Sequence, residues 1–233
     1  MIHRYKNNGY NIVMDISSGS VHVVDDIVYE VIPLAQQLVS AGIRDVDTVT
    51  IAVETLQELP FSHREVTEAV GEVISLAERG ILFAEDPIVH PVQEQIHLHQ
   101  HSDQVFARQV MTIAEQVRQK VCAEAHKACH AEELQHVNYY GEAALELIAE
   151  LKQKGSEREP DFQKGCESDV LSGKTMPEKC RKCFARYYCS GDRFQNEGGY
   201  DESQSIHEPE CERYKKCVEY AIMIKAALAD EDK

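Results

Sequence analysis

Four cysteines near the end of the chain constrain its fold more than any other feature. They follow a Cys-x2-Cys-x5-Cys run and an acidic, Gly-rich stretch, and they are Cys180, Cys183, Cys189 and Cys211. Two cysteines separated by two residues can direct both sulfur atoms to one metal ion or cluster, and two further thiolates complete a tetrahedral set. The run therefore predicts a metal centre. Scattered structural thiols are the better interpretation for Cys122 and Cys217.

The spacing leaves the identity of the metal open, because four thiolates bind zinc and an iron–sulfur cluster in similar geometry. The chain has eight cysteines in total. In an intracellular protein, cysteines are more often ligands and buried thiols than disulfide partners. Zinc and a cluster therefore both remain candidates on spacing alone.

The charge of the chain excludes several classes of partner. The formal net charge is −16, from 40 acidic and 24 basic side chains, and this charge repels phosphate backbones and anionic lipid surfaces. The sequence has no apolar run of about 18 residues and no basic start followed by an apolar segment. We therefore expect a cytoplasmic protein that binds neither nucleic acid nor membranes. A neutral or basic peptide is a more natural ligand.

The N-terminal segment begins with a predicted β-hairpin and two helices. Residues 10–15 and 21–24 are rich in β-prone side chains, and the serines and glycine between them form a turn cluster. Apolar residues recur at helical spacing over residues 25–38, where Pro33 predicts a kink or a boundary. A weaker helix, rich in β-branched residues, is predicted over residues 46–59.

A third helix is marked more clearly than the first two. Ser62 and Glu65 form a capping-box pattern, and an apolar stripe follows it up to Gly80. Residues 81–83 are apolar and predict a short closing strand. A hairpin, three helices and a closing strand together predict a winged-helix-like α+β domain.

Beyond residue 88 the sequence predicts mostly helices. Apolar spacing predicts a long helix over residues 103–137, a second over 142–154, and a last amphipathic helix over 217–228. We expect four segments: a winged-helix-like domain at 1–88, a linker at 89–102, a helical hairpin at 103–164, and a small Cys-rich domain with a C-terminal helix at 165–233.

Two further groups of potential ligands occur outside the cysteine run. The first group comprises His97, His99 and His101, which would share one side of an extended segment. The second comprises Cys122, His126 and Cys129, which would share one face of a helix. Solvated linker histidines and packed thiols are the commoner interpretations, so the sequence leaves the role of both groups open.

The cysteine run and both ends of the chain resemble one enzyme family. The segment Glu178–Gly191 (EKCRKCFARYYCSG) resembles the C-terminal SPASM region of radical SAM peptide maturases, in particular those that form thioethers in the Cys-rich SCIFF precursor peptides. The tail Cys211–Ala226 and the opening Met1–Tyr29 are similar to the two ends of the same enzymes. The combination of these motifs in this order is more specific than any one of them.

The resemblance implies that the four cysteines hold one auxiliary [4Fe–4S] cluster. Arg193 stands where the family has a cysteine of a second, inner cluster, so that cluster is not expected. Residues 1–88 would form a RiPP recognition element (PqqD-like), which adds a leader peptide as a strand to a sheet edge while helix side chains fill pockets. The residues implied in peptide binding are Val21, Val23, Val66, Val70 and Val73.

The defining loop of radical SAM enzymes is missing. That loop is Cys-x3-Cys-x2-Cys, which leaves one iron free for S-adenosylmethionine, and no such triplet occurs in this chain. Residues 91–165 are also too few for a catalytic barrel, which takes about 250 residues when complete. We therefore expect no S-adenosylmethionine binding and no catalysis by this chain alone. We expect it to bind a Cys-rich precursor peptide or its leader and to act beside a separate radical SAM protein.

Three alternatives remain open at this point. The missing catalytic core could be supplied by another chain, which would make the pair a working maturase. The chain could instead be a winged-helix regulatory or binding protein with a structural four-cysteine zinc site, although the acidic side chains of its third helix disfavour duplex binding. It could also be a shortened or decayed family member without activity.

Overall fold

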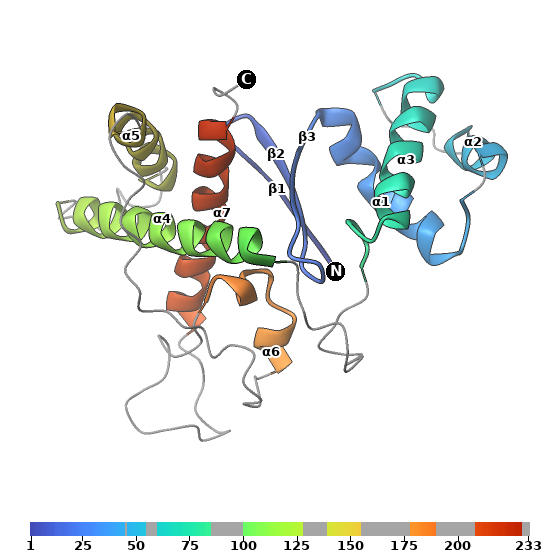
Figure 1. The fold of residues 1–233 in the computed structure, drawn as a ribbon. Coiled ribbons are helices and arrows are strands. Elements are labelled where there is room, and N and C mark those ends of the chain that lie inside the picture. The colour runs from blue at the N-terminus through green and yellow to red at the C-terminus, as the bar shows by residue number, and fades with distance from the viewer. Residues whose placement is uncertain are drawn as a thin grey trace. The chain divides into compact units, whose positions relative to one another are not determined.

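The computed structural model describes residues 1–44, 46–54, 60–84, 100–127, 139–154, 178–189 and 208–229. The chain divides into two units, Met1–Ile96 and His97–Lys233. The first combines an antiparallel sheet with helices and the second is helical, which confirms the predicted α+β class (Figure 1). The helices of the predicted hairpin and of the Cys-rich segment fall in the same unit. The boundary predicted between residues 164 and 165 lies outside the described residues.

The sheet of the first unit has three antiparallel strands in the order β1-β2-β3. The predicted hairpin is confirmed: β2 (Tyr10–Asp15) pairs with β3 (Val21–Val24), with Ile12 opposite Val23. Strand β1 (Ile2–Asn7) was not predicted, and it pairs with β2 across the two-residue turn Asn8–Gly9. Both turn residues have positive φ, 46° and 83°, the conformation that makes Asn-Gly favourable in tight hairpins.

The helix predicted over residues 25–38 is observed as α1 (Asp26–Ser40). It begins after Asp25, whose side chain accepts a hydrogen bond from the N–H of Val28. Pro33 lies inside this helix and does not end it. Proline has no N–H, so the carbonyl of Tyr29, four residues earlier, lacks its helical donor. The guanidinium of Arg4 on β1 donates to that carbonyl at 2.7 Å. A side chain from the sheet thus replaces the hydrogen bond that Pro33 removes.

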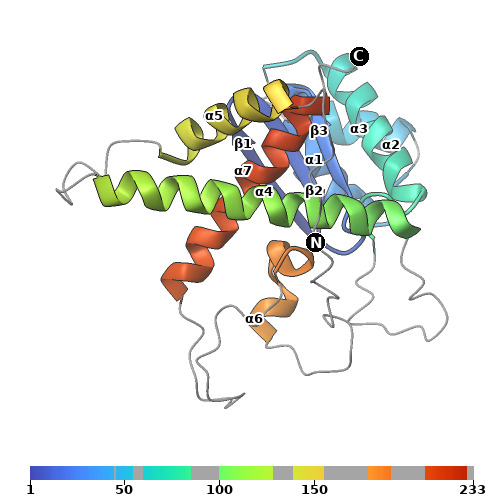
Figure 2. The ribbon, with the colours of Figure 1, turned by 60° about the vertical axis from the view of Figure 1, so that its left-hand side comes forward.

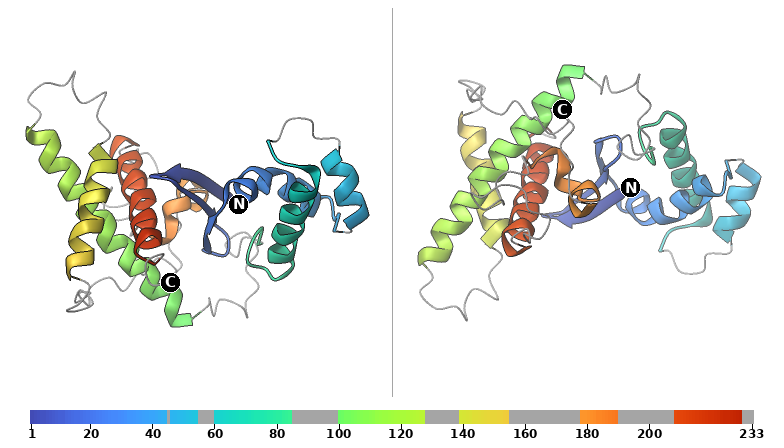
Figure 3. Two further views of the ribbon diagram at one scale, coloured as in Figure 1. Left: turned by 90° about the horizontal axis from the view of Figure 1, so that it is seen from above. Right: turned by 90° about the horizontal axis from the view of Figure 1, so that it is seen from below.

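Helices α2 (Val46–Glu54) and α3 (His63–Glu78) complete this unit, and α3 packs on α1 (Figure 3). The capping box is confirmed: the N–H of Ser62 donates to Glu65 Oε2 at 2.9 Å, and the N–H of Glu65 donates to Ser62 Oγ at 3.3 Å. The C-terminal part of the helix predicted over residues 46–59 lies outside the described residues beyond Glu54. The shared core takes apolar side chains from β2, α1, α2 and α3, together with Leu82.

The strand predicted over residues 81–83 is wrong. The end of α3 and side chains, and not a neighbouring strand, bond to the backbone here. The N–H groups of Ile81 and Leu82 donate to the carbonyl of Leu76 at 3.0 and 3.4 Å. The carbonyl of Ile81 accepts from Ser20 Oγ at 2.6 Å and from Ser18 Oγ at 3.2 Å. The N–H of Ala84 donates to Asp15 Oδ2 at 2.8 Å. Phe83 has a φ of 55°, which is incompatible with an extended strand. This segment is therefore a bent connection fastened to the β2–β3 turn.

The second unit is built from three long helices that pack on one another, α4 (Gln100–Lys127), α5 (Tyr139–Lys154) and α7 (Glu208–Ala229) (Figure 2). Lys120 of α4 joins α5 through Glu146 and Glu150, at 2.8 Å each. The part of the predicted first helix beyond Lys127 lies outside the described residues. Helix α7 begins at Glu208 and not at residue 217 as predicted, so it carries Cys211 in its first turns.

The remaining described elements of this unit are short. They are the helix α6 (Glu178–Arg181) and the 3-10 turn η3 (Phe184–Tyr187). Within the part of the chain that the structure describes, no helix combines the length and hydrophobicity needed to cross a membrane.

Candidate metal centre

A buried hydrogen bond fastens the cysteine run to α7. The hydroxyl of Tyr214 donates to the backbone carbonyl of Tyr188 at 2.7 Å, and both tyrosines are buried. Tyr188 directly precedes Cys189, and Tyr214 follows Cys211 by three residues, which is about one helical turn. The bond therefore joins the backbone beside the third cysteine to the turn of α7 that carries the fourth.

Two successive turns shape the chain between the first three cysteines. The N–H of Cys183 donates to the carbonyl of Cys180 at 3.1 Å, and the N–H of Arg186 donates to the carbonyl of Cys183 at 3.2 Å. All four cysteines of the predicted centre are half-buried. None of the six described cysteines forms a disulfide. These thiols are thus partly removed from water and are not paired in disulfides.

Several of these thiols influence one another's pKa. Burial raises the pKa of Cys180, and the charges of Cys183 and Cys211 raise it further. Burial also raises the pKa of Cys211; Lys215 lowers it, and Cys183 raises it again. Mutual repulsion of this kind requires that the three sulfur atoms lie close enough to interact. The charges of Cys183 and Cys211 thus act on Cys180, and the charge of Cys183 acts on Cys211.

The described residues do not form a finished coordination sphere. All four cysteines are among them, yet no group of three or more His, Cys, Asp or Glu side chains in the described ranges is arranged to hold a metal ion. The donor chemistry fits zinc or a [4Fe–4S] cluster, because both take four thiolates. Metal binding would have to deprotonate these thiols.

Comparison with known proteins does not choose between these possibilities. No family model, no curated protein and no solved structure matches this chain. The cysteine spacing and the hydrogen bond between Tyr214 and Tyr188 are the features of this chain that bear on the centre.

The residues implied in peptide binding divide into two groups. Val66, Val70 and Val73 are fully buried in the core of the first unit, so their side chains do not form a binding surface in this structure. Val21 is half-buried and Val23 is 48% exposed, and both lie on β3. Among the described strands, β3 pairs with β2 alone, so its outer edge could accept another strand.

The other candidate ligands are not brought together in the described ranges. Cys122 is exposed on α4, while Cys129 and the side chain of His126 lie outside the described residues. His97, His99 and the side chain of His101 also lie outside them. Cys217 is buried in α7, and burial raises the pKa of its thiol to about 12. Cys217 is therefore protonated at neutral pH and fits the interpretation of a structural thiol.

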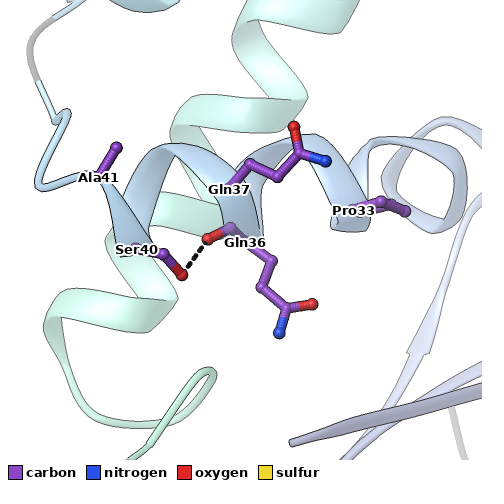
Figure 4. A pocket seen from close by; sticks show the side chains of 5 residues that line it. All are labelled: Pro33, Gln36, Gln37, Ser40 and Ala41. Atoms are coloured by element: carbon purple, nitrogen blue, oxygen red, sulfur yellow. Dashed lines mark hydrogen bonds between the residues drawn. The ribbon is translucent and has the colours of Figure 1, made fainter.

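A shallow, open depression lies along α1 (Figure 4). Its lining residues are Pro33, Gln36, Gln37, Ser40 and Ala41. The hydroxyl of Ser40 donates to the carbonyl of Gln36 at 2.7 Å, so its proton is used in a hydrogen bond within α1. The lining has no acid, base, cysteine or histidine, so the depression offers no catalytic group.

Sequence reasoning missed Tyr214 and Lys215 as residues that act on the cysteine run. A signal was present, because residues three and four positions after Cys211 share its side of a helix. The predicted helix began only at residue 217, so this spacing was not applied to Cys211. The late start of the predicted helix is therefore the reason that Tyr214 and Lys215 were not predicted.

Proposed function

We propose that this chain is a peptide-maturation protein that binds a precursor peptide and carries one metal centre. The ligands are Cys180, Cys183, Cys189 and Cys211, and the preferred occupant is an auxiliary-type [4Fe–4S] cluster, with zinc as the alternative. The observation that carries the proposal is the hydrogen bond from Tyr214 to Tyr188, because it holds the cysteine run beside the cysteine of α7. The family resemblance adds the choice of a cluster.

A bound cluster would supply electron transfer or local stability, since four protein thiolates leave no iron open to substrate. The chain's own contribution is to bind and orient. The sequence lacks the Cys-x3-Cys-x2-Cys loop, so the radical step would belong to a separate radical SAM protein. We therefore propose a binding or electron-transfer partner and not a complete enzyme.

Anaerobic reconstitution of the full chain with iron and sulfide tests the metal half of the proposal. We expect about four irons per chain and broad absorption near 400 nm in the wild type, both lost in Cys183→Ala, because a cubane on four thiolates requires all of them. The same reconstitution of Cys122→Ala is the matched control and should give the wild-type result. One zinc per chain without this absorption would favour the zinc-site binding protein, and wild-type protein without metal would contradict the centre.

The peptide half of the proposal places an extended peptide along β3. Backbone groups at the outer edge of a strand can pair with an added strand, and exposed side chains such as Val23 would contact its residues. The acidic charge of the chain favours a neutral or basic peptide. A Cys-rich precursor or its leader is the ligand that the resemblance suggests.

Peptides selected from a random display library against the full chain provide a defined probe of this edge. We expect Val23→Lys to weaken their binding at least about fivefold, because it removes an apolar contact and repels a basic peptide. Ile51 is 62% exposed on α2, so Ile51→Lys is a control with the same change in charge and should leave binding intact. Equal binding by both variants, or no recovered peptide, would contradict the peptide site.

The winged-helix regulator receives less support from the structure. Arg64 at the start of α3 is paired with Glu68 at 2.9 Å, and the neighbouring Glu65 is used by the capping box. A helix that reads DNA needs basic side chains available for phosphates. Binding of zinc in place of a cluster would be the result that indicates this function.

A further inference from the structure

The turn between β1 and β2 carries a chemically reactive pair of residues. Asn8 and Gly9 form this two-residue turn, and both are exposed. A Cβ atom placed on Gly9 would meet no heavy atom within 4 Å, apart from those of its chain neighbours. Among the described residues, none forms a hydrogen bond with the side-chain amide of Asn8. The pair therefore lies in open space at the tip of the hairpin.

An asparagine that precedes a glycine can react with its own backbone. The glycine nitrogen attacks the side-chain carbonyl carbon, Cγ, so that a C–N bond forms and the C–NH₂ bond breaks. Ammonia leaves with the proton that the glycine nitrogen gives up. Water then opens the five-membered imide at one of its two carbonyls, which yields either aspartate or its β-linked isomer, isoaspartate. The net reaction consumes water and releases ammonia without oxidation or reduction, and glycine favours it because no side chain shields its nitrogen.

The other two asparagines of the first unit lack this combination. Asn11 is followed by Ile12, and its side-chain nitrogen donates to Asp26 Oδ1 at 2.9 Å. Asn7 is followed by Asn8, whose side chain shields the nitrogen that would attack, and Nδ2 of Asn7 is buried. Asn8 is also the one asparagine of the whole sequence that precedes a glycine. Sequence and exposure thus single out the same residue.

The two products differ in how they fit the turn. Aspartate keeps the length of the backbone, and Asp-Gly is a favoured pair in two-residue hairpin turns. Isoaspartate adds one backbone atom between Asn7 and Tyr10, which pair across the turn. Because loop length sets the register of a hairpin, the longer turn no longer matches the pairing of β1 with β2. The bond from Arg4 of β1 to the carbonyl of Tyr29 depends on that pairing.

We propose that Asn8 is a site of spontaneous deamidation, and that its isoaspartyl form loosens β1 from the sheet. The reaction needs neither the metal centre nor a bound peptide. The ring closes only when the Gly9 nitrogen reaches Cγ of Asn8, so the rate depends on local opening of the turn. Few buried contacts hold the tip of a hairpin, and such segments open at low cost. The fold therefore slows the reaction without preventing it.

The test incubates the full chain and a synthetic peptide of residues 5–11 under the same mildly alkaline conditions and maps both by mass spectrometry. We expect Asn8 of the folded chain to react within about tenfold of the rate in the peptide, with a mass increase of about 1 Da at that residue. Asn7 and Asn11 should stay unchanged and serve as internal controls. An isoaspartyl methyltransferase, which methylates the free α-carboxylate of isoaspartate, distinguishes the two products. Conversion in the peptide without conversion in the folded chain would overturn the site.

Hydrogen exchange tests the effect on β1. The isoaspartyl fraction of the aged chain should exchange the β1 amides that pair with β2 at least about threefold faster than unreacted chain. Asn8→Asp is the matched control, because it has the added charge of the product without the longer backbone, and it should keep the exchange rates of the wild type. Equal rates in the isoaspartyl fraction and in Asn8→Asp, or aspartate as the sole product in the folded chain, would overturn the loosening of β1.

Discussion

Replacing Asp15 with alanine should lower the free energy of unfolding of the first unit by about 3 kcal/mol. Asp15 is 0% exposed. One carboxylate oxygen accepts from the N–H of Ser17 at 2.9 Å, and the other accepts from the N–H of Ala84 at 2.8 Å. Removing the carboxylate leaves a buried donor at Ser17 and a partly buried donor at Ala84 without this acceptor, and hydrogen bonds to charged groups contribute about 1.5–3 kcal/mol each.

Hydrogen exchange of the full chain, followed by mass spectrometry, can resolve this loss within residues 1–84. The slowest amides of the first unit should exchange faster in Asp15→Ala, while those of α4, α5 and α7 should change little. Asp25→Ala removes a carboxylate that accepts one N–H at the exposed start of α1, and it should cost less. A value for Asp15→Ala no larger than that for Asp25→Ala would contradict the role assigned to Asp15.

Removing one oxygen atom from Tyr214 should weaken the candidate metal centre. Tyr214→Phe keeps the buried ring but loses the bond to the carbonyl of Tyr188. We expect the free energy of unfolding of the second unit to fall by about 1–2 kcal/mol, the cost of leaving a buried acceptor unsatisfied. We also expect the affinity for Zn²⁺ to fall about fivefold, because the segment Glu178–Cys189 loses its attachment to α7.

Tyr140→Phe is the matched control for this change. Tyr140 lies in the same unit, and its ring stacks on Tyr220 with the ring centres 5.8 Å apart. Like Tyr214→Phe, this variant keeps the ring and removes one tyrosine hydroxyl. The affinity of Tyr140→Phe for Zn²⁺, measured by chelator competition, should stay within about twofold of the wild type. An equal loss in both variants would show that the Tyr214 bond has no special role at the centre.

Elements whose signals are local were predicted well from the sequence. The capping box placed the start of α3 correctly, because Ser62 and Glu65 satisfy each other's backbone within three residues. Strand β1 was not predicted, although Asn8–Gly9 is a strong local hairpin signal. The strand predicted at residues 81–83 failed for a different reason, since Ser18, Ser20 and Asp15 reach this backbone from a distant turn.

In the candidate site, too, the sequence predicted the local features and not the contacts between distant residues. The spacing of Cys180, Cys183 and Cys189 is local, and the sequence was enough to identify it. The apolar stripe of α3 showed that one face of the helix is buried, but periodicity does not distinguish burial in a core from contact with a peptide. Val70 and its neighbours on that stripe are core residues. Helical spacing places Tyr214 and Lys215 on the same side of α7 as Cys211, but the bond from Tyr214 to the carbonyl of Tyr188 depends on how α7 packs against the cysteine run, which no local pattern encodes.

The contact between Arg4 and the carbonyl of Tyr29 has a consequence for how the first unit assembles. Pro33 removes one backbone hydrogen bond inside the continuous helix α1, and a residue 25 positions before Tyr29 supplies a replacement donor. The middle of α1 is therefore completed by tertiary structure and not by its own sequence. A helix of this kind gains its last hydrogen bond only when strand β1 has docked, so the two elements form as one cooperative unit, and the folding barrier includes the entropy of closing the loop between them.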